Sequence, residues 1–274
     1  MGAKSNFRIG SQAALTKDVL MPLMRAGSQL LYYAHVPKCA GSALEHYLAA
    51  RFGSLAFVDT AYLSHSHPWT QTSPQHMDRH ALAQLFPAGF IDASFAVVRH
   101  PTARIISAWH FQLEQEKTVP QGMTFSDWLT DLPLQWAQTP YAYDNHTRPM
   151  SEIVPADAAV FYLEHGLEAI IPWLNMVVGD TNGPTEITQV NARRKKAKTP
   201  AKTSPSAGDL ALIGEIFAQD FERFGYRLED EAAPQANGHP CPIPGLPTGG
   251  AQSAPSPSLG ARAAQLIGKI RNRL

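Results

Sequence analysis

Short apolar runs alternate with segments of helical periodicity through the middle of the chain. The runs are almost continuously apolar, as in strands buried on both faces of a sheet, and lie at 30–36, 94–98 and 159–163. Apolar residues at helical spacing follow at 42–51, 102–113, 167–178 and 209–224. This alternation over about 28–230 predicts an α/β fold in three layers, with a central, mostly parallel sheet flanked by helices.

The two ends of the chain have a different composition. Residues 1–27 show weak periodicity, and we expect a poorly ordered lead-in there. Residues 231–258 hold seven prolines and four glycines, which predicts a linker because such a segment buries too little apolar surface to offset its ordering entropy. Residues 259–274 place basic residues between apolar ones at helical spacing. We expect a basic amphipathic tail helix that contacts a membrane surface or a partner; a frayed tail is the alternative.

Composition and charge narrow the classes of protein. With 44% apolar residues, the 274-residue chain can build a sizeable core, which argues against a disordered protein. The 23 basic residues balance 23 acidic ones, which argues against nucleic acid as a partner. Cys39 and Cys241 make no disulfide framework, and neither a long apolar span nor a secretory signal is visible. We therefore expect a soluble, cytoplasmic protein, whose oligomeric state the sequence does not reveal.

The first candidate for chemistry is the junction that reads HVPKCAGSALEHYL over residues 35–48, between a predicted strand and a predicted helix. Unpaired N–H groups and the positive end of the helix dipole make such a helix N-terminus an anion site. Gly41 would let the backbone approach an anion closely, and Lys38 would add a mobile positive charge. The spacing GxxxxGK[ST] of the common phosphate loop is absent. An ordinary turn with a surface lysine is the alternative.

The second candidate is the junction that reads FAVVRHPTARIISAWHF over residues 95–111. Arg99 ends a predicted strand, at the edge where ligands of open α/β sheets bind. Ser107 lies about two turns into the following helix, on the face that carries Arg104. A guanidinium and a hydroxyl that converge suit a second phosphate group. The alternative is an arginine that caps a loop and a serine without a ligand.

Together the two junctions resemble the sulfotransferases that use 3′-phosphoadenosine 5′-phosphosulfate (PAPS), in particular the carbohydrate-type branch with heparan sulfate 2-O-sulfotransferase and its bacterial relatives. That family carries a PKxxGS/T loop for the 5′-phosphosulfate and an RxPxxRxxSxY/W segment for the 3′-phosphate. VPKCAGS at 36–42 and RHPTARIISAW at 99–109 match both in order. Further likenesses are NHTRP at 145–149, YLE at 162–164, VNARRKK at 190–196 and DFERFGY at 220–226. The resemblance covers about 30–230, and Cys39 departs from it where many members have a hydroxyl residue.

The resemblance implies a P-loop-like fold and an enzyme that transfers a sulfuryl group from PAPS to an acceptor hydroxyl on a saccharide or glycan, with release of PAP. It implies that Lys38 contacts the leaving oxygen and that Arg99 and Ser107 hold the 3′-phosphate. The basic run from Arg193 falls where members place a loop over the cofactor or toward the acceptor; as a bare charge run it is a solvated loop. The cofactor-binding residues implied are Pro37, Lys38, Cys39, Ala40, Gly41, Ser42, Ala43, Arg99, Ser107 and Arg193.

A histidine is the expected base, because imidazole accepts a proton near neutral pH. In the resembled branch the catalytic histidine precedes the arginine of the 3′-phosphate segment by a little over twenty residues, and His76 lies 23 residues before Arg99. The run SHSHPW at 64–69 resembles the HxH pair of that branch, so His67 is the second candidate. We predict His76 and Lys38 as the catalytic residues, with His67 as the alternative base.

Acceptor contacts are expected from an aromatic face that could stack on a sugar ring and from the NHTRP segment; the residues are Trp69, Asn145 and Arg148. Core packing and turn chemistry are the alternatives for these side chains. A metal site among His65, His67, His76 and His80 is not expected, because HExxH is absent and both cysteines are distant in the sequence.

Two other functions stay open on the sequence. One is a kinase-like nucleotide-dependent phosphotransferase, against which the missing GK[ST] signature argues. The other is a non-catalytic nucleotide-binding protein. The presence together of Lys38, Arg99, Ser107 and a suitably placed histidine argues against it.

Overall fold

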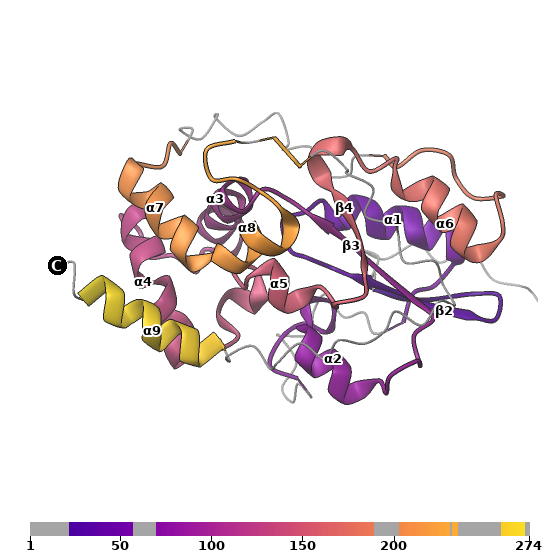
Figure 1. The fold of residues 1–274 in the computed structure, drawn as a ribbon, viewed down its shortest axis with the longest axis horizontal. Helices are drawn as coiled ribbons and strands as arrows, with labels where there is room; N and C mark the ends of the chain where they lie inside the picture. Colours follow the sequence, from indigo (N-terminus) through magenta and orange to yellow (C-terminus); the bar gives the residue numbers. More distant parts are fainter. Residues whose placement is uncertain (1–21, 57–69, 189–202, 231, 235–258, 272–274) are drawn as a thin grey trace, which may run out of the picture.

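Four strands form the central sheet of the computed structural model, which describes residues 22–56, 70–188, 203–230, 232–234 and 259–271 (Figure 1). β2 (Gln29–Ala34), β3 (Ala93–Val98) and β4 (Ala159–Tyr162) run parallel, and β1 (Leu23–Ala26) pairs antiparallel with β2. The order is β1-β2-β3-β4. Ala34 pairs with Ala96 and Val98 with Tyr162, so the parallel strands end at one carboxyl edge. The mostly parallel sheet predicted from the sequence is confirmed.

Helices cover both faces of this sheet and complete the three layers. α1 (Gly41–Phe52) and α6 (Ile170–Val178) lie above the strands in Figure 1, and α2 (Arg79–Leu85) and α5 (Met150–Ile153) lie below them. Their apolar side chains share one core with the strands. Residues of both faces of β2 and β3 are fully buried, as the continuous apolar runs predicted, among them Tyr33 and Phe95 on one face and Ala34 and Ala96 on the other.

A second apolar core lies beside the sheet and is built from helices. The helices concerned, at the left of Figure 1, are α3 (Pro101–Phe111), α4 (Phe125–Gln138), α7 (Ala207–Ile216), α8 (Ala218–Phe224) and α9 (Leu259–Arg271). Trp109, Trp128 and Trp136 are buried in this core, where they pack against one another or against Phe217. The shorter turns are η2 (Pro74–His76), the π-helical η3 (Gln112–Glu116), η4 (Ala142–Asn145) and η5 (Leu163–His165).

The tail helix packs onto the body of the protein. Ala263 and Leu266 of α9 are buried in the second core, where α9 lies along α4 (Figure 1). The buried part of its apolar face therefore contacts the chain itself. Within the described ranges, no helix is both long enough and apolar enough to cross a membrane.

Some boundaries differ from the sequence expectation. β1 lies within the expected lead-in 1–27. The sequence did not predict it, because a strand of four residues that includes Arg25 is too short to show periodicity. The helix expected over 209–224 is divided at Phe217, whose φ of −106° and ψ of 22° leave the helical range while its side chain fills the second core. Of the expected linker, 231 and 235–258 lie outside the described residues.

Candidate active site

The turn between β2 and α1 lies at the carboxyl edge of the sheet and has an unusual backbone. Lys38 and Ala40 adopt left-handed φ angles of 71° and 63°, which cost about 1 kcal/mol or more for residues other than glycine. The N–H groups of Ala43 and Leu44 both donate to the carbonyl of Ala40. The N–H groups of the residues just before them therefore lie at the open first turn of the helix, where an anion can accept hydrogen bonds.

Gly41 makes room beneath this turn for a buried ion pair. A Cβ at residue 41 would lie 2.0 Å from Nε2 of His35, so only glycine fits against that ring. Nδ1 of His35 lies 2.6 Å from Oε1 of Glu45, and both residues are buried. Burial alone would raise the pKa of Glu45, but the charge and hydrogen bond of His35 lower it. The pair therefore joins the end of β2 to the first turns of α1 and supports the turn from below.

The second junction meets the first at this edge. Nη1 of Arg99 donates to the carbonyl oxygen of Lys38 at 3.4 Å, and Nζ of Lys38 lies 3.8 Å from the ring centre of Phe111 at the end of α3. Burial, and then the charge of Arg99, lower the pKa of Lys38 to about 8. Two cationic groups thus lie in one partly buried place, which is an environment that attracts a multiply charged anion.

The remaining loop residues differ in how their side chains can act. Cys39 is fully buried, and burial raises the pKa of its thiol to about 12. Pro37 and Ala43 are also buried. The N–H groups of Cys39 and Ala43 donate within the turn, to the carbonyls of Val36 and Ala40, and Pro37 has no N–H to donate. Ser42 on α1 and Ser107 on α3 are partly exposed, so their hydroxyls remain accessible.

Hydrogen bonds from the end of β4 hold the Arg99 segment in place. The N–H of His100 donates to Oε1 of Glu164 at 2.7 Å, and the hydroxyl of Tyr226 donates to Oε2 of the same carboxylate at 3.0 Å. Nε2 of His100 lies 3.0 Å from the carbonyl oxygen of Arg227. The YLE and DFERFGY segments therefore meet next to Arg99, where they fix the start of α3.

His76, the predicted base, is paired with a carboxylate. Nδ1 of His76 lies 2.7 Å from Oδ2 of Asp144, and the other oxygen of Asp144 accepts the N–H of Ser73 at 2.6 Å. Burial would raise the pKa of Asp144, but the hydrogen bond and charge of His76 lower it, so the carboxylate is ionised. A carboxylate on Nδ1 leaves Nε2 of an imidazole as the proton acceptor.

The backbone that presents Asp144 is strained. Tyr143, Asp144 and Asn145 have left-handed φ angles of 57°, 52° and 59° in succession. Such conformations persist only where the surroundings impose them, and they concentrate at functional sites. Here the bonds of Asp144 to Ser73 and His76, and the bond from Nδ2 of Asn145 to the carbonyl of His76 at 2.8 Å, impose the conformation.

A row of aromatic rings connects His76 to the turn that bears Lys38. The ring of His76 lies 5.0 Å from that of His35 and 4.7 Å from that of His146. His146 in turn stacks on Phe111, the ring that Lys38 covers, at 4.8 Å. Burial, and then the charge of His76, lower the pKa of His146, so that imidazole is neutral near pH 7. His76 and Lys38 thus belong to one cluster.

Asn145 and Arg148, predicted to contact an acceptor, are buried and hydrogen-bonded to the chain. Arg148 donates to Oδ1 of Asn145 at 2.8 Å, to Oε2 of Glu152 at 2.7 Å and to the carbonyl of Pro140 at 3.0 Å. The exposed fractions of Asn145 and Arg148 are 1% and 6%. This placement differs from the expectation of an acceptor contact: both side chains hold the segment that carries Asp144. His67, Trp69 and Arg193 lie outside the described residues.

Donor atoms of His76, Asp144 and His146 lie within 4.8 Å of one another, close enough to ligate a metal ion together. The sequence did not indicate this group, since it combines one expected histidine with two residues from a distant segment. Asp144 already binds Nδ1 of His76, which is the arrangement of a base with its orienting carboxylate.

Sequence reasoning missed several members of the cluster. His35 and Glu45 lie inside the first motif, and their spacing of ten residues gave no sign of pairing. Asp144 and His146 flank Asn145, so the NHTRP segment was the available signal. Arg104 proved to be fully buried, where it donates to the carbonyls of His146 and Arg148, and so does not point to a ligand with Ser107.

Comparison with known proteins assigns the family. The model of the sulfotransferase family matches residues 21–227, which include the four strands, both junctions and the pair of His76 and Asp144. The chain therefore belongs to the sulfotransferase family, and its sheet with flanking helices is the P-loop-like fold of that family. Its general activity is sulfuryl transfer. Neither a search of curated proteins nor a search of solved structures finds a match.

Proposed function

We propose that the protein transfers a sulfuryl group from PAPS to an acceptor hydroxyl, with His76 as the general base. The observation that supports this most is the meeting of Lys38, Arg99 and His76 in one cluster at the carboxyl edge of the sheet. Two cationic side chains and an open helix N-terminus suit a nucleotide with phosphate at two positions. The cluster thus contains groups for both the donor and the proton.

Each residue would have a distinct role in an in-line transfer. The acceptor oxygen forms a bond to sulfur while the bond between sulfur and the bridging oxygen of PAPS breaks, which leaves PAP. Nε2 of His76 takes the hydroxyl proton, and Asp144 orients the ring and stabilises the imidazolium. The ammonium of Lys38 stabilises the charge that develops on the bridging oxygen. Arg99 and Ser107 would hold the 3′-phosphate.

The acceptor class rests on the resemblance to the carbohydrate-type branch, which favours a saccharide hydroxyl. Trp69 and Arg193 stay proposed contacts to the acceptor and the cofactor. Asn145 and Arg148 would serve the reaction by holding the strained segment around Asp144, since their polar groups bind other parts of the chain. His67 remains the alternative base.

The decisive experiment is a labelled-sulfate transfer assay from PAPS against a panel of glycans, lipids and phenols. Lys38→Ala should lower kcat by about 10³-fold with an unchanged fold, because the leaving oxygen loses its cation. Lys269→Ala, which removes an exposed cation on α9, is the matched control and should leave transfer unchanged. Full turnover by Lys38→Ala would refute the proposed role.

The base is tested in the same assay with Asp144→Asn. Asparagine tolerates the left-handed φ of residue 144, so the fold should persist while the carboxylate is lost. We expect kcat to fall by about 10²-fold or more with unchanged PAP affinity. Calorimetry with PAP and with ATP separates the remaining candidate functions, since tight ATP binding without a response to PAP would indicate a kinase.

A further inference from the structure

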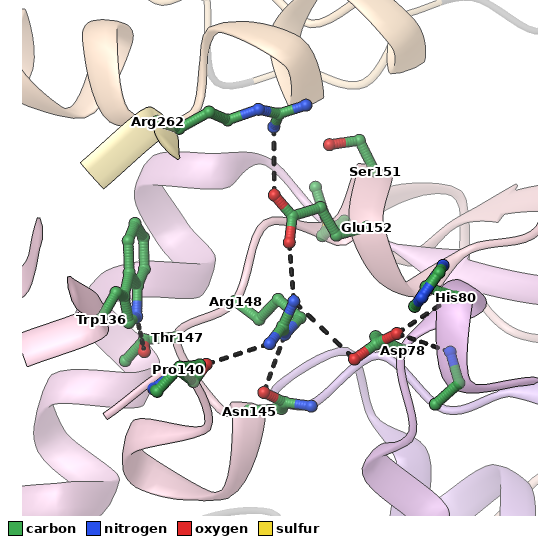
Figure 2. A network of polar contacts seen from close by, with 12 residues as sticks. Asp78, His80, Trp136, Pro140, Asn145, Thr147, Arg148, Ser151, Glu152 and Arg262 are labelled. Atoms are coloured by element: carbon green, nitrogen blue, oxygen red, sulfur yellow. Dashed lines mark hydrogen bonds and ion pairs between the residues drawn. The ribbon is translucent and has the colours of Figure 1, made fainter. Parts of the chain in front are cut away.

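A chain of buried polar contacts runs from the tail helix to His76, and Figure 2 shows its part from Arg262 to Asn145. Nη1 of Arg262, on α9, lies 3.1 Å from Oε1 of Glu152, and Oε2 of Glu152 accepts Nη1 of Arg148 at 2.7 Å. Nε of Arg148 donates to Oδ1 of Asn145, whose Nδ2 donates to the carbonyl of His76 at 2.8 Å. Each contact in the chain is a direct hydrogen bond or ion pair.

The same network holds the segment after His76. Nη1 of Arg148 lies 3.8 Å from Oδ2 of Asp78, and Oδ1 of Asp78 accepts the N–H groups of His80 and Ala81 at the start of α2. Arg148 therefore holds the carbonyl of His76 through Asn145, and it pairs directly with Asp78 two residues later. Figure 2 shows its guanidinium between these two residues and Glu152.

Docked α9 adds a second cation to this network. Arg148 pairs with both Asp78 and Glu152, and Arg262 gives Glu152 a further positive charge. Burial raises the pKa of Glu152 although both guanidinium groups oppose this rise, so its ionised form depends on Arg262 as well as on Arg148. Loss of either cation from a buried site leaves an uncompensated carboxylate, which is costly.

Stability alone does not account for Arg262. Within the described part of the chain, its Nε and Nη2 atoms are buried without a hydrogen-bond partner, so the side chain is desolvated for a single ion pair. Such pairs add little net stability, and a role in setting one geometry is the better-supported use. Arg262 also lies outside residues 21–227, to which the family match extends.

We propose that docking of α9 positions the catalytic base: Arg262, Glu152 and Arg148 act as positioning residues that fix His76 against Asp144. The proposal rests on the proposed function for its kinetic consequence, but the geometric part stands without it. A misplacement of a reacting group by about 1 Å can cost about 10²-fold in rate, so a loosened anchor several contacts away should have a smaller, measurable effect.

The test compares Arg262→Ala with the conservative Arg262→Lys and with Lys269→Ala, an exposed position on the same helix. Imidazole nitrogen resonances of His76, assigned by comparison with His76→Asn, are recorded in the full chain with PAP, and kcat and KM are measured separately. We expect Arg262→Ala to shift the His76 resonances and to lower kcat about tenfold without a change in KM for PAPS. Arg262→Lys should restore part of both, and Lys269→Ala should match the wild type.

Each outcome decides the proposal. Wild-type His76 resonances and kcat in Arg262→Ala would overturn it. Arg262→Ala could lower the Tm enough to obscure the comparison. In that case Glu152→Gln removes the central charge at nearly constant shape and should shift the His76 resonances in the same way. Unshifted His76 resonances in Glu152→Gln would also overturn the proposal. A wild-type protein that transfers no sulfate refutes the proposed function, while the resonances still test the coupling of α9 to His76.

Discussion

Lys38 shows how a single residue depends on the chain around it. Its ammonium is needed for the proposed role, yet burial and Arg99 lower its pKa to about 8. The ring of Phe111 at 3.8 Å offers a cation–π contact that partly compensates the lost water. An anionic ligand between Lys38 and Arg99 would favour the protonated form and thus raise the pKa of Lys38 again.

This pKa predicts that PAP affinity depends on pH. Below about pH 8 the free protein holds Lys38 protonated and ready for the anion, and above that value a proton must be taken up on binding. The Kd for PAP should therefore rise as pH rises, by up to about tenfold per pH unit above 8. Calorimetry between about pH 7.5 and 9.5 measures this, in a range where the phosphates of PAP are fully ionised.

Lys38→Arg is the control for that prediction, because a guanidinium stays charged over the whole range. Its PAP affinity should be lower than that of the wild type but almost independent of pH. A wild-type affinity that is equally flat would show that Lys38 does not titrate in the binding reaction.

At the scale of elements, the turn between β2 and α1 depends on close packing as much as on charge. Two left-handed residues shape it, and the ring of His35 supports it from inside through Gly41 and Glu45. The first N–H groups of α1 are therefore fixed by a packed contact behind them. The motif in the sequence reports the residues at the surface of the turn and says little about that support.

Gly41→Ala should disrupt this element. The new Cβ would lie 2.0 Å from Nε2 of His35, so the ring or the turn must move. We expect the free energy of unfolding to fall by about 1–3 kcal/mol, as in other overpacked sites, and PAP affinity to fall with it. Thermal unfolding and calorimetry measure the two effects.

The matched control is Gly208→Ala in the first turn of α7, where the nearest side-chain atom, Oγ of Ser206, would lie at 3.7 Å. This change should leave stability equal or slightly raised, since alanine favours a helix over glycine. Equal behaviour of the two variants would contradict the packing argument for Gly41.

At the scale of the whole molecule, two buried charged residues hold the segment that lies between the two cores. Arg104 on α3 is fully buried and donates to the carbonyls of His146 and Arg148, while Asp220 on α8 accepts the N–H groups of Met150 and Ser151 at 2.8 Å each. Burial lowers the pKa of Arg104, and the negative charge of Asp220 raises it, so Asp220 partly offsets the cost of burying the guanidinium. The segment that carries Asp144 is thus held between two helices.

Asp220→Asn should destabilise the protein strongly, because it leaves the guanidinium of Arg104 buried without its counter-charge. We expect a loss of about 3 kcal/mol in the free energy of unfolding. Glu222→Gln, on the exposed face of the same helix, should change it by less than about 0.5 kcal/mol. Denaturant unfolding measures both, and a near-wild-type Asp220→Asn would show that the two charges are not coupled.

The parallel strands, the two junctions and their order could be predicted from the sequence alone. Strands buried on both faces need continuous apolar runs, and ligands of such sheets bind where those runs end. Both features depend on neighbouring residues in the chain, so the segments 30–36 and 94–98 were enough to predict them. The resemblance to the sulfotransferases also predicted His76 as the base, which stays a prediction. The short strand β1 and the break at Phe217 were not readable, because packing against distant residues decides them.

Which side chains meet depends on the packing of the folded chain and could not be predicted from the sequence. The pairing of His76 with Asp144 joins residues 68 positions apart, and the contact of Arg262 with Glu152 joins residues 110 apart. No local periodicity encodes such contacts, since they follow from how strands and helices pack once the chain has folded. For the same reason the structure, and not the sequence, placed Asn145 and Arg148 within the support of the site.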